Sequence, residues 1–109
     1  GAIVARLDAT DIEHRLHQAE AETQLARQAL AAAEAATAAS ESELRLATQQ
    51  FARTQALAER GYAANETMDQ RQQQLDSAAA AVAASKARAA EARAAIDAAE
   101  ARVAQMQTL

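Results

Sequence analysis

The most regular feature of the chain is a seven-residue spacing of apolar and small residues on either side of one interruption. Two such series precede the interruption and two follow it. A heptad spacing of this kind places one continuous stripe on each of two helices, and such stripes pack against each other along their length. The first pair of series is Leu16, Thr23, Leu30, Thr37, Leu44, Phe51 and Ile12, Ala19, Ala26, Ala33, Ser40, Ala47. The second pair is Met68, Leu75, Val82, Ala89, Ile96, Val103 and Ala78, Ser85, Ala92, Ala99, Met106.

The interruption has the chemistry of a helix end followed by a helix start. Gly61 suits a left-handed residue that closes a helix in a Schellman motif, which would set Tyr62 against Leu57. Asn65 then suits the N-cap of the next helix. The connection over residues 61–64 is short enough to return the chain antiparallel to itself.

The fold class predicted from this pattern is all-α, a long antiparallel two-helix coiled-coil hairpin. Its first arm covers about residues 11–60, its tip 61–64 and its second arm about 65–109. Partners across such a hairpin have residue numbers with a nearly constant sum, and one turn position brings all four series into register. The register predicts that Ser40 and Ser85 form a polar layer.

The first residues do not follow the helical period. The segment GAIVARL predicts a β-strand within residues 1–8, with the hairpin occupying 9–109. Thr10 and Glu13 form a capping-box pattern, so the helix is expected to begin near Asp11. Because a lone strand is not stable, we expect the chain to be a piece of a larger protein, with this strand ending a truncated domain.

Composition narrows the functional classes. The chain contains 36 Ala but one Phe, one Tyr and no Trp, which is typical of a helical rod rather than a globular core. Its net charge of −4 with interspersed signs argues against binding nucleic acid. It has no Cys and no Pro, and its apolar runs are shorter than a membrane span.

Candidate chemistry is sparse. His14 and His17 stand three residues apart beside Glu13, but no third ligand converges on them, so no metal site is expected. The carboxylates lie on a rod without a concave pocket that would shift their pKa values. We therefore expect no catalytic residues, no cofactor and no enzyme activity.

Two segments resemble the periplasmic adaptor family, also called membrane fusion or HlyD-like proteins. AIVARLDATDIEHRLHQAEA is similar to the exit from the first half of that family's lipoyl-like domain. The interruption resembles the family's hairpin tip, in which an Arg and a Leu precede a Gly, a small apolar pair and a Ser. The matching positions are Arg53, Leu57, Gly61, Tyr62, Ala63 and Ala64. Ala64 replaces the Ser, and Thr67 replaces a frequent Glu.

This resemblance implies a function. In the family, the tip Arg, Leu and Ser contact a TolC-like outer-membrane channel, and several hairpins assemble side by side into a ring or tube. The resemblance thus implies a periplasmic adaptor that is anchored to the inner membrane and joins a transporter to the channel for efflux or secretion. The alternative is a structural coiled-coil stalk or spacer that binds partners along its flanks.

Overall fold

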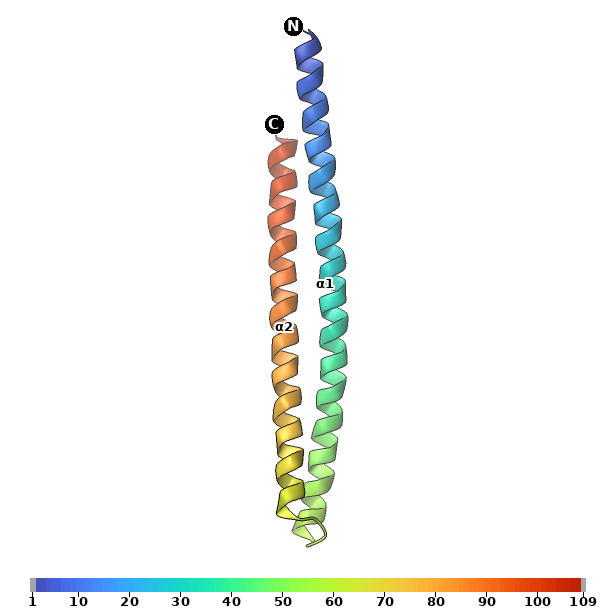
Figure 1. Cartoon of the computed structure of the whole chain (residues 1–109), viewed down its shortest axis with the longest axis vertical. Helices are drawn as coiled ribbons and strands as arrows, with labels where there is room; N and C mark the ends of the chain where they lie inside the picture. Colours follow the sequence, from blue (N-terminus) through green and yellow to red (C-terminus); the bar gives the residue numbers. More distant parts are fainter. Residues whose placement is uncertain (1, 109) are drawn as a thin grey trace. The chain divides into compact units, whose positions relative to one another are not determined.

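The computed structural model describes residues 2–108 and contains two α-helices (Figure 1). Helix α1 spans Ala2–Glu59, and helix α2 spans Asn65–Gln107. Their length follows from composition, since alanine has the highest helix propensity and no proline interrupts either helix. Residues 2–108 contain no strand. The predicted all-α class with two long helices is confirmed.

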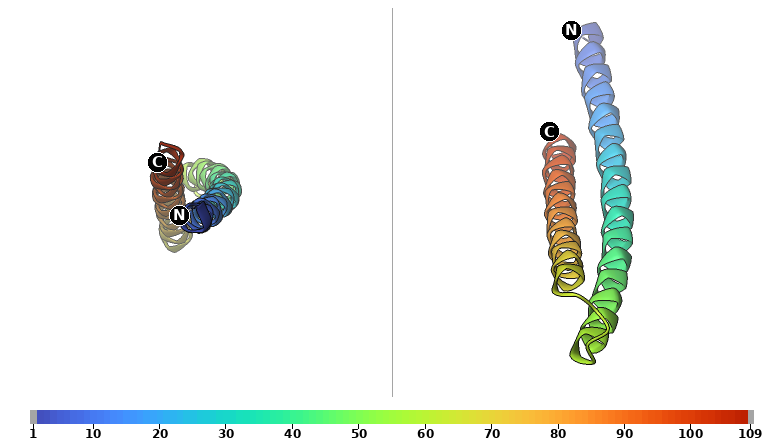
Figure 2. Two further views of the ribbon diagram at one scale, coloured as in Figure 1. Left: turned by 90° about the horizontal axis from the view of Figure 1, so that it is seen from above. Right: turned by 60° about the horizontal axis from the view of Figure 1, so that its bottom comes forward.

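The described residues form two compact units, which we treat separately. The turn unit is residues 33–89, and the terminal unit is residues 2–32 with 90–108. In the turn unit, the end of α1 and the start of α2 form an antiparallel helical hairpin, with the connecting turn brought forward in the right view of Figure 2. This hairpin agrees with the predicted fold-back at residues 61–64.

The turn unit buries the residues that the heptad series predicted. Ala47, Val82 and Ala89 are buried, and so is Ser85. The Ser40 and Ser85 hydroxyl oxygens lie 3.0 Å apart in a hydrogen bond between the two helices. The predicted polar layer is therefore confirmed, and with it the register of this unit.

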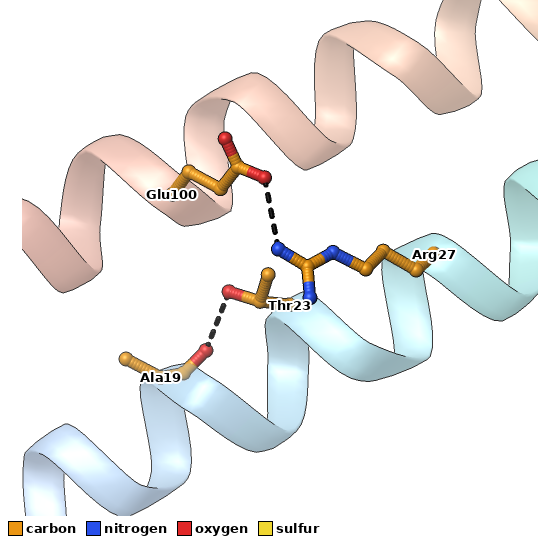
Figure 3. Close-up of polar contacts among 4 residues, drawn as sticks. All are labelled: Ala19, Thr23, Arg27 and Glu100. Carbon is orange, nitrogen blue, oxygen red and sulfur yellow. Dashed lines mark hydrogen bonds and ion pairs between the residues drawn. The ribbon is translucent and has the colours of Figure 1, made fainter.

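The terminal unit also buries residues of the heptad series, namely Ala19, Thr23 and Ala99. Figure 3 shows how the hydroxyl of Thr23 is satisfied: it donates to the Ala19 carbonyl at 2.9 Å, one turn back on the same helix. Two ion pairs cross from α1 to α2 at the surface. They are Arg27 with Glu100 at 3.1 Å and Arg102 with Glu22 at 3.0 Å.

The most buried positions of the seam in both units carry small side chains. The most buried apolar residues are four alanines and Val82, and no large side chain among the described residues is fully buried. Each buried methyl or methylene group contributes only about 0.8 kcal/mol. The layers therefore bring the helix backbones close together while each stabilises the unit weakly.

The strand predicted within residues 1–8 is wrong over the part that the structure describes, because helix α1 already begins at Ala2. A strand satisfies its backbone groups only through a neighbouring strand, whereas a helix satisfies them within the segment. The apolar residues of this segment are exposed, with Ile3 at 75% and Leu7 at 65%.

The predicted capping box near the start of the first arm is also wrong. Thr10 lies inside α1, and its hydroxyl donates to the Arg6 carbonyl at 2.9 Å instead of capping a helix start. Threonine makes this bond to the carbonyl four residues back whenever the helix continues through it. Neither glycine nor proline lies between Ala2 and Asp11 to stop the helix there.

Candidate docking tip

The turn between the two helices closes with the predicted Schellman motif. Gly61 has a φ of 81°, the left-handed conformation that glycine adopts without a steric cost. The Tyr62 N–H donates to the Leu57 carbonyl at 2.8 Å, and the Gly61 N–H donates to the Ala58 carbonyl at 3.0 Å. These two bonds define the motif and satisfy carbonyls that the end of α1 would otherwise leave unpaired.

The motif presents two apolar side chains to solvent. Tyr62 is 78% exposed, the largest value among the exposed large hydrophobic residues, and Leu57 is 41% exposed. The expected apolar contact between them thus covers little of the tyrosine ring. Because the Tyr62 N–H is bonded to Leu57, the backbone that carries the ring is held in place.

The other tip residues named from the sequence lie around this pair. Arg53 is exposed and precedes the buried Thr54, so its side chain leaves the packed face of α1. Arg53 and Leu57 are four residues apart on one helix, a spacing that places them on the same face. Ala63 is half-buried and Ala64 is exposed.

The start of α2 differs from the prediction by one residue. The Met68 N–H donates to the Ala64 carbonyl at 3.2 Å, so Ala64 occupies the capping position and Asn65 is the first helical residue. An alanine offers no side-chain acceptor to the free N–H groups of the first turn. The helix therefore starts without a side-chain cap at Ala64, while Glu66 provides negative charge in the first turn.

One further residue near the turn, Arg71, is not among the predicted docking residues, although the heptad spacing places it at a seam position. Arg71 is half-buried at a position of the α2 seam, where a charged side chain normally costs stability. Its Nη1 donates to Gln74 Oε1 at 2.9 Å and to Gln50 Oε1 at 3.4 Å. The arginine stands in a heptad series that continues with the small residues Ala78 and Ser85.

Other polar groups do not converge on a site. Residues 2–108 contain no group of three or more His, Asp or Glu side chains placed to hold a metal ion, and His14 and His17 are exposed. A groove of about 590 Å³ in the terminal unit is lined by His17, Glu20 and Arg27 among others. Arg27 is engaged there by Glu100 (Figure 3).

Neither helix, within residues 2–108, contains a stretch with the length and hydrophobicity needed to cross a bilayer. Comparisons of the chain with protein-family models, curated proteins and solved structures returned no match.

Proposed function

We propose that this chain is the hairpin segment of a periplasmic adaptor protein and that its turn docks onto a TolC-like outer-membrane channel. The observation that carries the proposal is the exposed apolar pair at the turn, Leu57 and Tyr62, held by the Schellman motif. Exposed Leu and Tyr side chains on a fixed backbone are suited to a protein interface, because little entropy is lost when they are buried.

The residues of the tip would make different kinds of contact with the channel. Leu57 and Tyr62 supply apolar area, and Arg53 supplies a guanidinium that recognises carboxylates or carbonyls of a partner. Ala64 provides no hydroxyl in the place where the resembled family has a Ser. Docking by this chain therefore relies on apolar contact and on Arg53, without that hydrogen bond.

The proposal includes the wider assembly that the resemblance implies. The protein would act in the periplasm, with parts outside this chain anchoring it to the inner membrane and to a transporter. Several copies would associate into a ring or tube around the exported substrate. The segment itself would perform no catalysis and bind no cofactor. It would contribute by spanning the gap between the transporter and the channel and by recognising the channel.

The alternative function is a structural stalk or spacer whose partners bind its flanks. Two exposed leucines on α1 away from the turn favour it, Leu25 at 68% and Leu46 at 55%. Under this alternative, changes at the turn would leave binding intact and changes at these leucines would weaken it.

The test uses the full-length protein and the purified TolC-type channel of the same organism. Leu57→Asp and Arg53→Asp are each expected to weaken binding at least about tenfold, the effect of an interface residue worth about 1.4 kcal/mol or more. Leu25→Asp and Arg88→Asp are the matched controls, since both replace an exposed side chain away from the turn. Circular dichroism checks that each variant keeps its helices.

Unchanged binding by both tip variants would contradict docking through the turn. Loss of binding in Leu25→Asp with normal binding in Leu57→Asp would favour the stalk. Export by cells that carry each variant provides a second readout of the same distinction.

A further inference from the structure

The turn unit carries a groove beside its seam that the docking tip does not use. It lies between α1 and α2, has a volume of about 840 Å³, and is lined by four apolar residues, Leu46, Ala47, Ala78 and Ala81, and by seven polar ones, Glu43, Gln50, Gln70, Arg71, Gln73, Gln74 and Ser77. Leu46 is 55% exposed, so a large apolar side chain stands at the rim of this groove. A groove in which apolar residues lie among polar ones is suited to an amphipathic helix, whose apolar face would meet the apolar residues and whose flanks would meet the polar ones.

Arg71 lines this groove too, and no ion pair in the described part of the chain joins it to Glu43, the carboxylate in the same lining. Its hydrogen bonds go to the amide oxygens of Gln50 and Gln74, which carry no net charge. Within residues 2–108, no carboxylate forms an ion pair with Arg71, in contrast to Arg27 and Arg102 in the terminal unit. A half-buried guanidinium bonded only to neutral amides retains the capacity to bind a carboxylate through two parallel N–H donors.

The surroundings of Arg71 orient it toward the groove. Gln50 lies on α1 and Gln74 lies on α2, so the two amides hold Nη1 from both sides of the groove. A side chain held in this way loses less rotamer freedom when it binds a partner than a free surface arginine does.

We propose that this groove binds an amphipathic helix of another protein, and that a single Asp or Glu in the apolar face of that helix pairs with Arg71. Apolar residues of the bound helix would cover Leu46 and the alanines of the groove, and the carboxylate would set its position along α2. This site is separate from the docking tip, and it is compatible with an adaptor as well as with a stalk.

The test measures binding of a defined probe to the whole chain by fluorescence anisotropy. The probe is a labelled helical peptide of about 20 Leu, Ala and Gln residues with one Glu in the middle of its apolar face. Its twin carries Gln in place of that Glu. We expect the Glu peptide to bind the wild-type chain about tenfold more tightly than the Gln peptide, the effect of one charge-assisted hydrogen-bonded pair.

Two variants assign this preference to Arg71. Arg71→Gln should bind both peptides equally, and Arg71→Glu should prefer a third peptide in which Lys replaces the Glu. Arg88→Gln, which removes an exposed positive charge from α2 outside the groove, should keep the tenfold preference. Circular dichroism establishes that each variant is folded.

The proposal is overturned if the wild-type chain binds the Glu and Gln peptides equally, if it binds neither, or if Arg71→Gln retains the preference. Self-association of the chain in sedimentation that Arg71→Gln abolishes would assign the groove to a second copy, and that result would also overturn the proposal.

Discussion

The hydroxyl groups of Ser40 and Ser85 bond to each other across the turn unit at 3.0 Å, and both belong to the packed face of their helices. The bond joins positions 45 residues apart in the chain. Because each hydroxyl has its partner on the opposite helix, a shift of register would separate them and bring each against an apolar neighbour. In this unit, the pair thus stabilises the observed alignment of α1 and α2 relative to alignments that are shifted along the helices.

Removing one of these hydroxyls should cost more than removing both. Ser85→Ala leaves the Ser40 hydroxyl without its partner and is expected to destabilise the turn unit by about 0.5–1.5 kcal/mol. The double variant Ser40→Ala, Ser85→Ala is expected to be nearly neutral, since no polar group remains unpaired. Urea unfolding of the four members of this cycle measures the coupling energy. Additive single effects would contradict a direct bond.

Gly61→Ala should destabilise the turn by about 1–2 kcal/mol. A Cβ atom at residue 61 would meet nothing within 4 Å beyond its two chain neighbours, so the cost arises from the positive φ and not from a clash with another part of the protein. Gly61→Asn is the matched control, because asparagine adopts this conformation more readily and should cost less. Thermal unfolding compares the two variants, and an equal loss in both would exclude backbone conformation as the cause.

Ala64→Ser should stabilise the start of α2 by about 0.5–1 kcal/mol. The Ala64 carbonyl accepts the first helical hydrogen bond, so a serine hydroxyl at this position can accept from a free N–H of the first turn. Asn65→Ala is the control, since residue 65 already lies within the helix and should lose no cap when its amide is removed. A loss in Asn65→Ala without a gain in Ala64→Ser would move the cap to residue 65.

The ion pair between Arg27 and Glu100 should contribute little and should depend on salt. Both side chains are about half exposed, 53% and 51%, so water screens the attraction. Arg27→Gln is expected to cost about 0.5 kcal/mol or less in dilute buffer and to cost nothing at about 1 M NaCl. Chemical denaturation with urea at both salt concentrations measures the difference, and a large loss that persists in high salt would show that Arg27 contributes through packing.

Val82→Ala should destabilise the turn unit, because Val82 is the one buried apolar side chain in residues 33–89 that is larger than alanine. Val82 is 7% exposed, and the loss of two buried carbon atoms should cost about 1–2 kcal/mol. Leu25→Ala removes more atoms, but from a side chain that is 68% exposed, and should cost almost nothing. Equal effects of the two substitutions would contradict the assigned seam.

Much of this fold was predictable because the seven-residue spacing, which is visible within a short segment, determines which residues far apart in the chain pack together. The seven-residue series placed Ser40 opposite Ser85, and a single turn position at Gly61 was sufficient to align them. The helix end was predictable for a similar reason, since the motif around Gly61 depends only on residues within one helical turn.

The errors arose where local signals compete with the continuation of a helix. Thr10 has the side chain of a cap, yet the same hydroxyl bonds equally well to the Arg6 carbonyl within a helix. Asn65 is a better cap than Ala64 by propensity, but the backbone of the turn decided which carbonyl accepted the first bond. The groove around Arg71 was not predictable, because it depends on how side chains of both helices lie side by side.

At the alanines of the seam, nearly all substitutions change the side-chain volume in the same direction. At Ala47 or Ala89 almost every substitution enlarges the side chain, and the one that reduces it, to glycine, weakens the helix itself by about 1 kcal/mol. Within each unit, sequence drift at these positions can therefore only push the helices apart. With alanine at these positions, the two backbones are already close to their minimum separation. The surface residues of the unit can therefore change far more freely than the distance between its two helices.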